Sequence, residues 1–253
     1  LTTAADVLDC SQADVAAACE RLVSRAAIEQ VDTRPSDRTD QTEHRRLALP
    51  ALGRAEVSLS SDLLRLAGNR GSALSDTELE KRLALAGAAL GFELEGSQRD
   101  AVIGALSNGL MVVTGGPGTG KTTIVQGVIA ASEPDGVRVA LAAPTGRAAR
   151  RLSEATLCDA KTVHRLLEFE PRTRSFQRNA QRPVDADLVI IDESSMLDAR
   201  LGAALCRAVA AGARLLLVGD ADQLPSVGPG AVLDDLIASD RCPVVLLDRI
   251  YRQ

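Results

Sequence analysis

The sequence GGPGTGKTT at residues 115–123 decides the fold. A short apolar run, 110–114, precedes it, and an apolar segment that begins at Ile124 follows it, which is the context of a strand, a loop and a helix. The pattern fits G-x-x-x-x-G-K-[ST], in which glycines let backbone N–H groups turn inward around phosphate oxygens. The N-terminus of the following helix adds partial positive charge. The stretch therefore predicts a phosphate-binding loop in an α/β protein.

Side chains of this loop suit a nucleotide and its metal ion. Lys121 is expected to reach the β- and γ-phosphates, and Thr122 is expected to ligate Mg²⁺. We therefore expect ATP and Mg²⁺ as cofactors. The other loop residues expected to contact the nucleotide are Gly115, Gly116, Pro117, Gly118, Thr119, Gly120 and Thr123.

Two further motifs follow apolar runs of strand length. The first, LVIIDESSM at 188–196, places Asp192 where a carboxylate holds Mg²⁺ and Glu193 where it orients or activates the attacking water. The second is GDADQLPSVGPG at 219–230, in which Gln223 is expected to hydrogen-bond a γ-phosphate or its water. Each motif alone is a common turn-rich or acidic loop, but the combination is more specific than nucleotide binding in general.

Short apolar runs recur from residue 96 onward, with helical stretches between them. Continuous apolar strands that alternate with helices predict a parallel sheet covered on both faces. Ligands of such sheets bind at the carboxyl ends of the strands, which is where the motifs fall. The expected strands are 110–114, 137–142, 188–191, 215–218 and 244–247.

The first 92 residues have a different pattern and are expected to form a separate, mostly helical region. An apolar-periodic run ends near Val23, and two short strands are expected at 28–31 and 46–49 around a polar loop. This order is typical of a winged-helix unit, which either binds DNA or serves as a packing module. Further helices are expected at 51–67 and 76–90, with Ser75 and Glu78 as a capping pair for the second.

Composition excludes several classes of protein. The chain has 253 residues, of which 45% are hydrophobic and 25% charged, as in an ordinary globular protein. No apolar run approaches the roughly 20 residues of a membrane span, so we expect no membrane partner. Five scattered cysteines, without a CxxC pair, and two histidines argue against a metal or disulfide framework and favour a cytoplasmic location.

The charge is unevenly distributed. The net charge is −5, but residues 144–182 contain nine Lys and Arg against four Asp and Glu. A basic stretch on an acidic protein indicates either a localised nucleic-acid contact or a solvated charged face.

The motifs together resemble the RecD branch of the superfamily 1 DNA helicases, which includes the exodeoxyribonuclease V alpha subunit and stand-alone relatives. The resemblance covers about residues 95–253, and is carried by GGPGTGKTT, APTGRAARR (143–151), TVHRLL (162–167), DESSM, GDADQLPSVGPG and IYRQ (250–253). It implies a RecA-like ATPase motor domain over 93–253, moving 5′-to-3′ on single-stranded DNA in recombination or repair. The family's second motor domain is expected to be absent from this chain. Implied partners are single-stranded DNA, duplex junctions and the nuclease or helicase subunits of an exodeoxyribonuclease V-like complex.

The resemblance also assigns roles to individual residues. Gln98 matches the glutamine that reads adenine, and Arg252 in IYRQ matches an arginine that stabilises charge on the γ-phosphate. A strand-separating β-hairpin, or pin, is implied at about 168–183, where Phe176 either stacks on a base or anchors the hairpin. Matches to single-stranded DNA contacts are Pro144, Thr145, Gly146, Arg147, Thr162 and His164. For His164 the alternative is a residue at a helix start that packs locally.

Two alternatives stay open beside a helicase motor. The helicase part of a conjugative relaxase would need a nicking domain, but the sole tyrosine is Tyr251 and no histidine cluster exists. An inactive scaffold subunit is the other alternative, and the intact Lys121, Asp192 and Gln223 count against it. Neither an LSGGQ-like transporter signature nor an NKxD of GTPases occurs.

Overall fold

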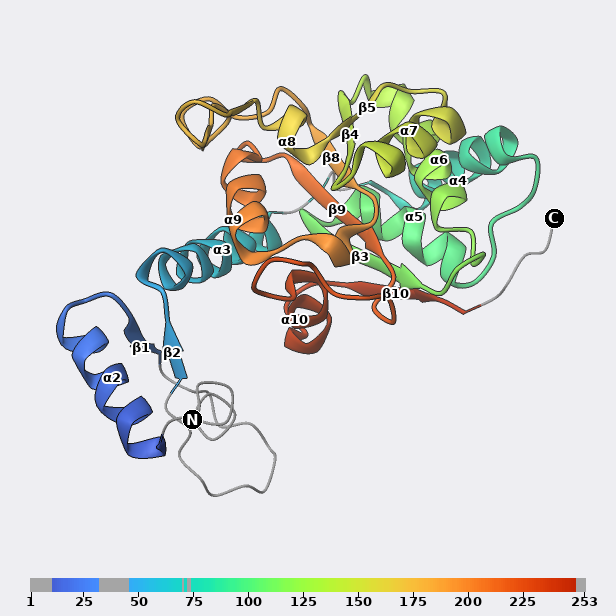
Figure 1. Ribbon diagram of the computed structural model, residues 1–253. Helices are drawn as coiled ribbons and strands as arrows, with labels where there is room; N and C mark the ends of the chain where they lie inside the picture. The colour runs from blue at the N-terminus through green and yellow to red at the C-terminus, as the bar shows by residue number, and fades with distance from the viewer. Residues whose placement is uncertain (1–10, 32–45, 70, 72–73, 249–253) are drawn as a thin grey trace. The chain divides into compact units, whose positions relative to one another are not determined.

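A six-stranded parallel sheet is the centre of the computed structural model, which describes residues 11–31, 46–69, 71 and 74–248 (Figure 1). Every neighbouring pair of strands is parallel, so all six carboxyl ends lie at one edge. This architecture confirms the predicted RecA-like α/β class. The spatial order is β10 (Val244–Leu247), β3 (Leu110–Gly115), β9 (Arg214–Gly219), β8 (Leu188–Ile191), β4 (Val139–Ala143) and β5 (Ala160–Thr162).

Helices cover both faces of this sheet (Figure 1). Both Met111 and its neighbour Val112 on β3 are fully buried, although their side chains point to opposite faces, because each face is packed against helices. One face carries α4 (Asp76–Leu90), α5 (Ser97–Ser107), α6 (Lys121–Ser132) and α7 (Gly146–Thr156). The other carries α9 (Ala199–Ala208) and α10 (Val232–Ser239).

Local sequence explains where the helices begin and end. The Ser75 hydroxyl accepts a hydrogen bond from the Glu78 N–H at the start of α4, as the capping pair predicted. Gly91 ends the same helix in the left-handed conformation, with φ of 78°. Leu83 and Ala86 on the buried side of α4 belong to the same apolar core as α6 and the sheet.

Short elements connect the larger ones. They are the 3-10 helices η1 (Glu133–Asp135) and η2 (Ser194–Met196), the single-turn helix α8 (Val163–Leu166), and the antiparallel pair β6 (Phe169–Glu170) and β7 (Ser175–Phe176). The β6–β7 hairpin lies within the segment where a pin was expected. No helix in the described part of the chain is long and apolar enough to cross a membrane.

The chain divides into two compact units, Leu1–Val57 and Ser58–Gln253. The first unit contains α2 (Gln12–Ser24) and the antiparallel pair β1 (Glu29–Val31) and β2 (Arg46–Ala48). Helix α3 (Pro50–Gly68) runs through the division. The division thus falls earlier than the boundary expected near residue 92, and α4 belongs to the unit of the sheet. Whether the first unit is a winged-helix module stays a prediction.

Candidate active site

The loop between β3 and α6 has the backbone geometry of a phosphate cradle. Gly118 and Gly120 have φ of 78° and 88°, in the left-handed region that side chains rarely adopt. A Cβ on Gly115 would lie 2.5 Å from the carbonyl oxygen of Leu247 on the neighbouring strand β10. Glycine is therefore required at these positions by backbone conformation or by close packing. The loop delivers Lys121 and Thr122 to the first turn of α6.

Lys121 folds over this loop. Its Nζ donates to the carbonyl oxygens of Gly115 at 2.5 Å and Gly116 at 2.9 Å. The buried Thr119 hydroxyl donates to the Gly116 oxygen as well, at 2.8 Å, and holds the turn. An ammonium group has three donors, so one remains for a phosphate oxygen.

Asp192 and Glu193 follow the fully buried strand β8. Asp192 Oδ1 accepts a hydrogen bond from the Glu193 N–H at 2.9 Å. Burial raises the pKa of Asp192, and the neighbouring Glu193 carboxylate raises it further, whereas the Glu193 N–H and Lys121 lower it. Glu193 itself has φ of 54°, a strained value for a non-glycine residue of the kind found at functional sites.

Gln223 lies in the loop after β9 and is held by a carboxylate from the same loop. Its Nε2 donates to Asp220 Oδ2 at 3.2 Å, and its backbone N–H donates to the Asp220 carbonyl oxygen. Asp220 is 2% exposed, and its Oδ1 accepts from the Asp222 N–H at 3.0 Å. The Thr114 hydroxyl, at the end of β3, accepts from the Ala221 N–H at 3.3 Å.

Strand order brings these motifs together. β9 lies between β3 and β8, so the phosphate loop, the Gln223 loop and the Asp192–Glu193 pair leave three adjacent strands at the same edge. In the described residues no group of three or more His, Cys, Asp or Glu is arranged to hold a metal ion. An Mg²⁺ ion bound through one carboxylate, a hydroxyl and substrate phosphates needs no such group.

The two residues assigned by resemblance to the nucleotide have different outcomes. Gln98 lies in the first turn of α5, is 4% exposed, and its side chain forms no hydrogen bond with the rest of the described chain. An amide whose donors and acceptor have no partner in the described chain suits recognition of a base edge. Arg252 lies outside the described residues, so its role stays a prediction.

Sequence reasoning missed Asp220. Its signal was present: it is the first polar side chain after an apolar strand and stands three residues before the glutamine. What the sequence does not reveal is that its carboxylate is buried and hydrogen-bonded to that glutamine.

The expected DNA contacts lie at the same edge of the sheet, at the ends of the next two strands after β8. Thr145 follows β4, and Thr162 is the last residue of the adjacent strand β5. Each threonine caps the next helix: the Thr145 hydroxyl accepts from the Ala148 N–H and the Thr162 hydroxyl from the Arg165 N–H, both at 3.2 Å. Pro144 and Gly146 stand beside Thr145, and Arg147 is exposed in the first turn of α7. These residues form a group separate from the phosphate loop.

An aromatic cluster joins His164 to the hairpin. Phe169 and Phe176 are paired across β6 and β7, with ring centroids 5.1 Å apart, and the His164 ring lies 5.4 and 5.6 Å from them. Glu168, which precedes Phe169, forms ion pairs with Arg178 at 2.6 Å and Arg182 at 3.0 Å. These contacts fix the base of the hairpin, and all three rings take part in packing.

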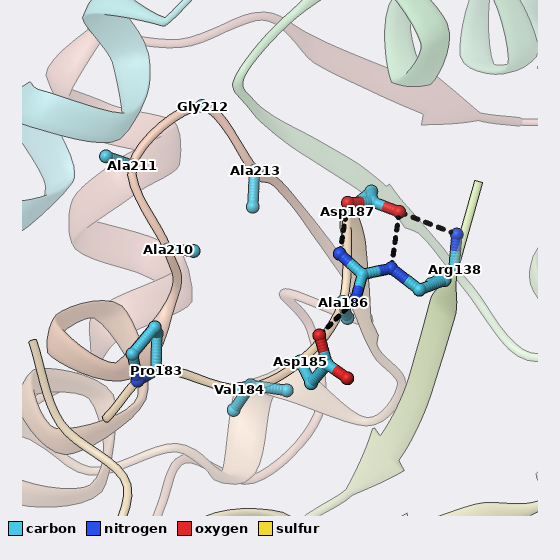
Figure 2. A pocket seen from close by; sticks show the side chains of 10 residues that line it. All are labelled: Arg138, Pro183, Val184, Asp185, Ala186, Asp187, Ala210, Ala211, Gly212 and Ala213. Atoms are coloured by element: carbon cyan, nitrogen blue, oxygen red, sulfur yellow. Dashed lines mark hydrogen bonds and ion pairs between the residues drawn. The ribbon is translucent and has the colours of Figure 1, made fainter. Parts of the chain in front are cut away.

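A hollow of about 420 Å³ lies at the opposite edge of the sheet, before β4, β8 and β9 (Figure 2). Arg138 lines the hollow, and its guanidinium pairs with Asp187 at 2.8 Å and also with Asp185. The hydrogen bonds from Arg138 lower the pKa of Asp187 to about 2. None of the predicted site residues that the structure describes lines this hollow. Its charged groups pair with one another across the strand starts.

The fold, the glycine-rich loop and the carboxylate after β8 define a P-loop nucleotide-binding protein. The chain belongs to the family described as AAA domain, whose model matches residues 98–229, more than half of the chain.

Curated relatives confirm the resemblance to RecD-type proteins. The chain is 49% identical over 144 residues to the ATP-dependent RecD2 DNA helicase of Deinococcus radiodurans, covering 57% of this chain and 20% of the relative. It is 46% identical over 164 residues to the RecBCD enzyme subunit RecD of Mycobacterium tuberculosis, covering 55% and 28%. The chain thus spans between a fifth and a third of the length of these relatives. Among solved structures, the Pif1 helicase from Candida albicans matches with a TM-score of 0.44 and 22% identity, over 63% of this chain and 41% of that one.

Proposed function

We propose that this chain is the ATP-hydrolysing motor domain of a RecD-type DNA helicase that acts in recombination or repair. The observation that carries the proposal is the meeting of three motifs on adjacent strands: the phosphate loop after β3, Gln223 after β9, and Asp192 with Glu193 after β8. The names of the relatives support the link to DNA. Movement in the 5′-to-3′ direction follows from the family resemblance.

The chain's own residues divide the work of ATP hydrolysis. Gln98 would receive the adenine edge, while the loop N–H groups and Lys121 would bind the phosphates. Glu193 would take a proton from the attacking water, whose oxygen bonds to the γ-phosphorus as the bond to the β–γ bridging oxygen breaks. ADP and phosphate are the products. Arg252 is proposed to stabilise the charge that develops on the γ-phosphate.

Thr122 and Asp192 fit a magnesium site. A hydroxyl and a carboxylate oxygen are ligands that Mg²⁺ prefers, and the half-buried Asp192 forms no ion pair within the described chain. Mg²⁺, when bound there, neutralises charge on the β- and γ-phosphate oxygens.

Ion pairing supports a single-stranded DNA surface beside this site. Four of the nine basic residues at 144–182 pair with carboxylates: Arg150, Lys161, Arg178 and Arg182. The remaining five are exposed and have no acidic partner in the described chain: Arg147, Arg151, Arg165, Arg172 and Arg174. Unpaired arginines are free to contact phosphates, so the local positive charge is available to a strand that also contacts Pro144, Thr145 and Thr162.

The β6–β7 hairpin is proposed to be the pin that meets a duplex junction. Arg172 and Arg174 lie in or beside its turn, and Glu168 anchors its base. The names of the relatives support two working forms, a stand-alone helicase and a subunit of an exodeoxyribonuclease V-like complex with nuclease and helicase partners.

The test is ATP hydrolysis by the full-length protein, with and without single-stranded DNA. We expect hydrolysis that DNA stimulates, and its loss in Lys121→Ala. Lys81→Ala is a matched control, because Lys81 is exposed on α4 and, within the described chain, pairs only with Glu78, at 3.9 Å. Hydrolysis that single-stranded DNA does not stimulate, or that persists in Lys121→Ala, would contradict the proposal.

A further inference from the structure

The loop after β9 contains a carboxylate, that of Asp220, to which the proposed mechanism of ATP hydrolysis assigns no role. Asp220 is almost completely buried, yet it forms no ion pair within the described chain. Burying a charge is costly unless hydrogen bonds compensate, so its contacts define what it does. Its side chain has two: Oδ1 accepts from the Asp222 N–H at 3.0 Å, and Oδ2 accepts from Gln223 Nε2 at 3.2 Å.

These contacts fix which way round the Gln223 amide lies. A carboxylate only accepts hydrogen bonds, so the atom of Gln223 that faces Asp220 must be Nε2. The carbonyl oxygen Oε1 then points away from Asp220.

We infer that Asp220 is a positioning residue that orients Gln223 so that its carbonyl oxygen accepts a hydrogen bond from the attacking water. The inference rests on the proposed ATP hydrolysis. A water molecule has two O–H bonds and needs two acceptors to hold it with a lone pair toward phosphorus. Glu193 supplies one acceptor and Gln223 Oε1 the other, from loops that follow the adjacent strands β8 and β9. The second hydrogen of Nε2 stays available to a phosphate oxygen.

Asp220→Asn should reverse the amide without disturbing the loop. The Asp222 N–H still requires an acceptor, which keeps the side-chain oxygen of the introduced asparagine on that side and turns its NH₂ group toward Gln223. Gln223 must then offer Oε1 to that group, and Nε2 points outward in place of an acceptor. We expect the kcat for ATP hydrolysis to fall by about tenfold to a hundredfold, the size typical of a misplaced reacting group. The Kd for a fluorescent ATP analogue should stay within about twofold.

Gln223→Glu supplies the complementary change. Alone it places two carboxylates in contact where a 3.2 Å hydrogen bond was, which destabilises the loop and lowers kcat. Combined with Asp220→Asn, one oxygen of the introduced glutamate accepts from the asparagine NH₂ group and the other faces the water. The double variant should therefore regain at least about tenfold in kcat over Gln223→Glu. Asp222→Asn is the control, because the exposed Asp222 side chain forms no hydrogen bond or ion pair within the described chain.

Two assays compare the wild type, the two single variants, the double variant and the control. One measures steady-state ATP hydrolysis with saturating single-stranded DNA, and the other measures thermal unfolding without nucleotide. A midpoint that falls in Gln223→Glu and recovers in the double variant supports the contact, because it does not depend on hydrolysis. If the Tm shifts of the two single variants simply add up in the double variant, the contact is refuted. If the double variant recovers its Tm but not its kcat, the positioning role is refuted. A wild type that does not hydrolyse ATP would refute the proposed function and the positioning role with it, while the unfolding data would still report on the contact.

Discussion

Gly228 is the position at which a single methyl group should most directly disturb the loop that carries Gln223. A Cβ added there would lie 2.1 Å from Asp198 Oδ2 and 2.8 Å from the Cβ and Cγ atoms of Asp198. Asp198 is the N-cap of α9, and its Oδ1 accepts from the Leu201 N–H at 2.7 Å. Gly228→Ala must therefore move either the cap or the loop.

The magnitude follows from these contacts. Turning the Asp198 carboxylate away loses the cap, which costs about 1 kcal/mol. The remaining overlap between the two Cβ atoms requires a backbone shift, and overpacking of this kind costs about 1–3 kcal/mol. We expect a loss of about 3 kcal/mol in the free energy of unfolding, or about 6–12 °C in Tm for a chain of this size. Asp198→Gly removes the three atoms that lie nearest to the new methyl group and should itself cost only a few tenths of a kcal/mol.

Thermal unfolding of four proteins tests this reasoning: wild type, Gly228→Ala, Asp198→Gly and the double variant. The cost of Gly228→Ala should almost vanish in the Asp198→Gly background, because contacting residues are not additive. Gly68→Ala is the matched control, since no atom lies within 4 Å of its added Cβ. If Gly228→Ala lowers Tm equally in both backgrounds, the contact with Asp198 is not the cause.

Three other expectations follow from the same structure. Burial raises the pKa of Asp192, so its charged form opposes folding: the penalty appears as pH rises above the unfolded-state pKa of about 4 and persists at pH 7. Asp192→Asn should thus raise Tm at pH 7, converge with wild type in acid, and abolish Mg²⁺-dependent hydrolysis; a lower Tm at pH 7 would contradict this. Burial raises the pKa of the Cys206 thiol to about 12 and that of the Cys242 thiol to about 11. Alkylation of the native protein at pH 8, followed by mass spectrometry, should therefore modify the half-buried Cys158 before either of them. Earlier modification of Cys206 would contradict its burial. Glu168→Gln weakens both ion pairs at the hairpin base and should reduce unwinding of a tailed duplex more than DNA-stimulated hydrolysis; equal loss of both would argue against a pin.

The sheet could be predicted because its strands are continuous apolar runs. β8 is buried along its whole length, and its sequence LVII leaves no polar alternative. β5 was missed for the opposite reason: Ala160–Thr162 contains a lysine, has no apolar run, and pairs only with β4 at the edge of the sheet. The start of α4 was predictable from the capping pair Ser75 and Glu78, but an amphipathic pattern does not say what the apolar face of the helix packs against. The structure places that face in the core of the sheet unit.

The candidate site divides in the same way. Lys121, Asp192 and Gln223 each follow an apolar run in a recognisable motif, so the residue types could be read without coordinates. The contacts of Asp220 could not be predicted in this way, because they depend on a buried carboxylate that accepts hydrogen bonds from Asp222 and Gln223 of its own loop. The aromatic cluster of His164 was equally hidden, since it joins a helix to a hairpin whose strands are two residues long.

The two groups proposed to hold the attacking water are fixed to one rigid piece of backbone. Glu193 follows β8 and Gln223 follows β9, and these strands are hydrogen-bonded neighbours. The buried Ser194 hydroxyl ties them again by donating to the Val218 carbonyl oxygen at 2.9 Å. A Cβ on Gly219 would lie 2.7 Å from that hydroxyl oxygen, so the two loops are already as close as their atoms allow. Because the backbone fixes the separation of the two loops that carry these side chains, damage to this junction should appear in the rate of hydrolysis before it appears in nucleotide affinity.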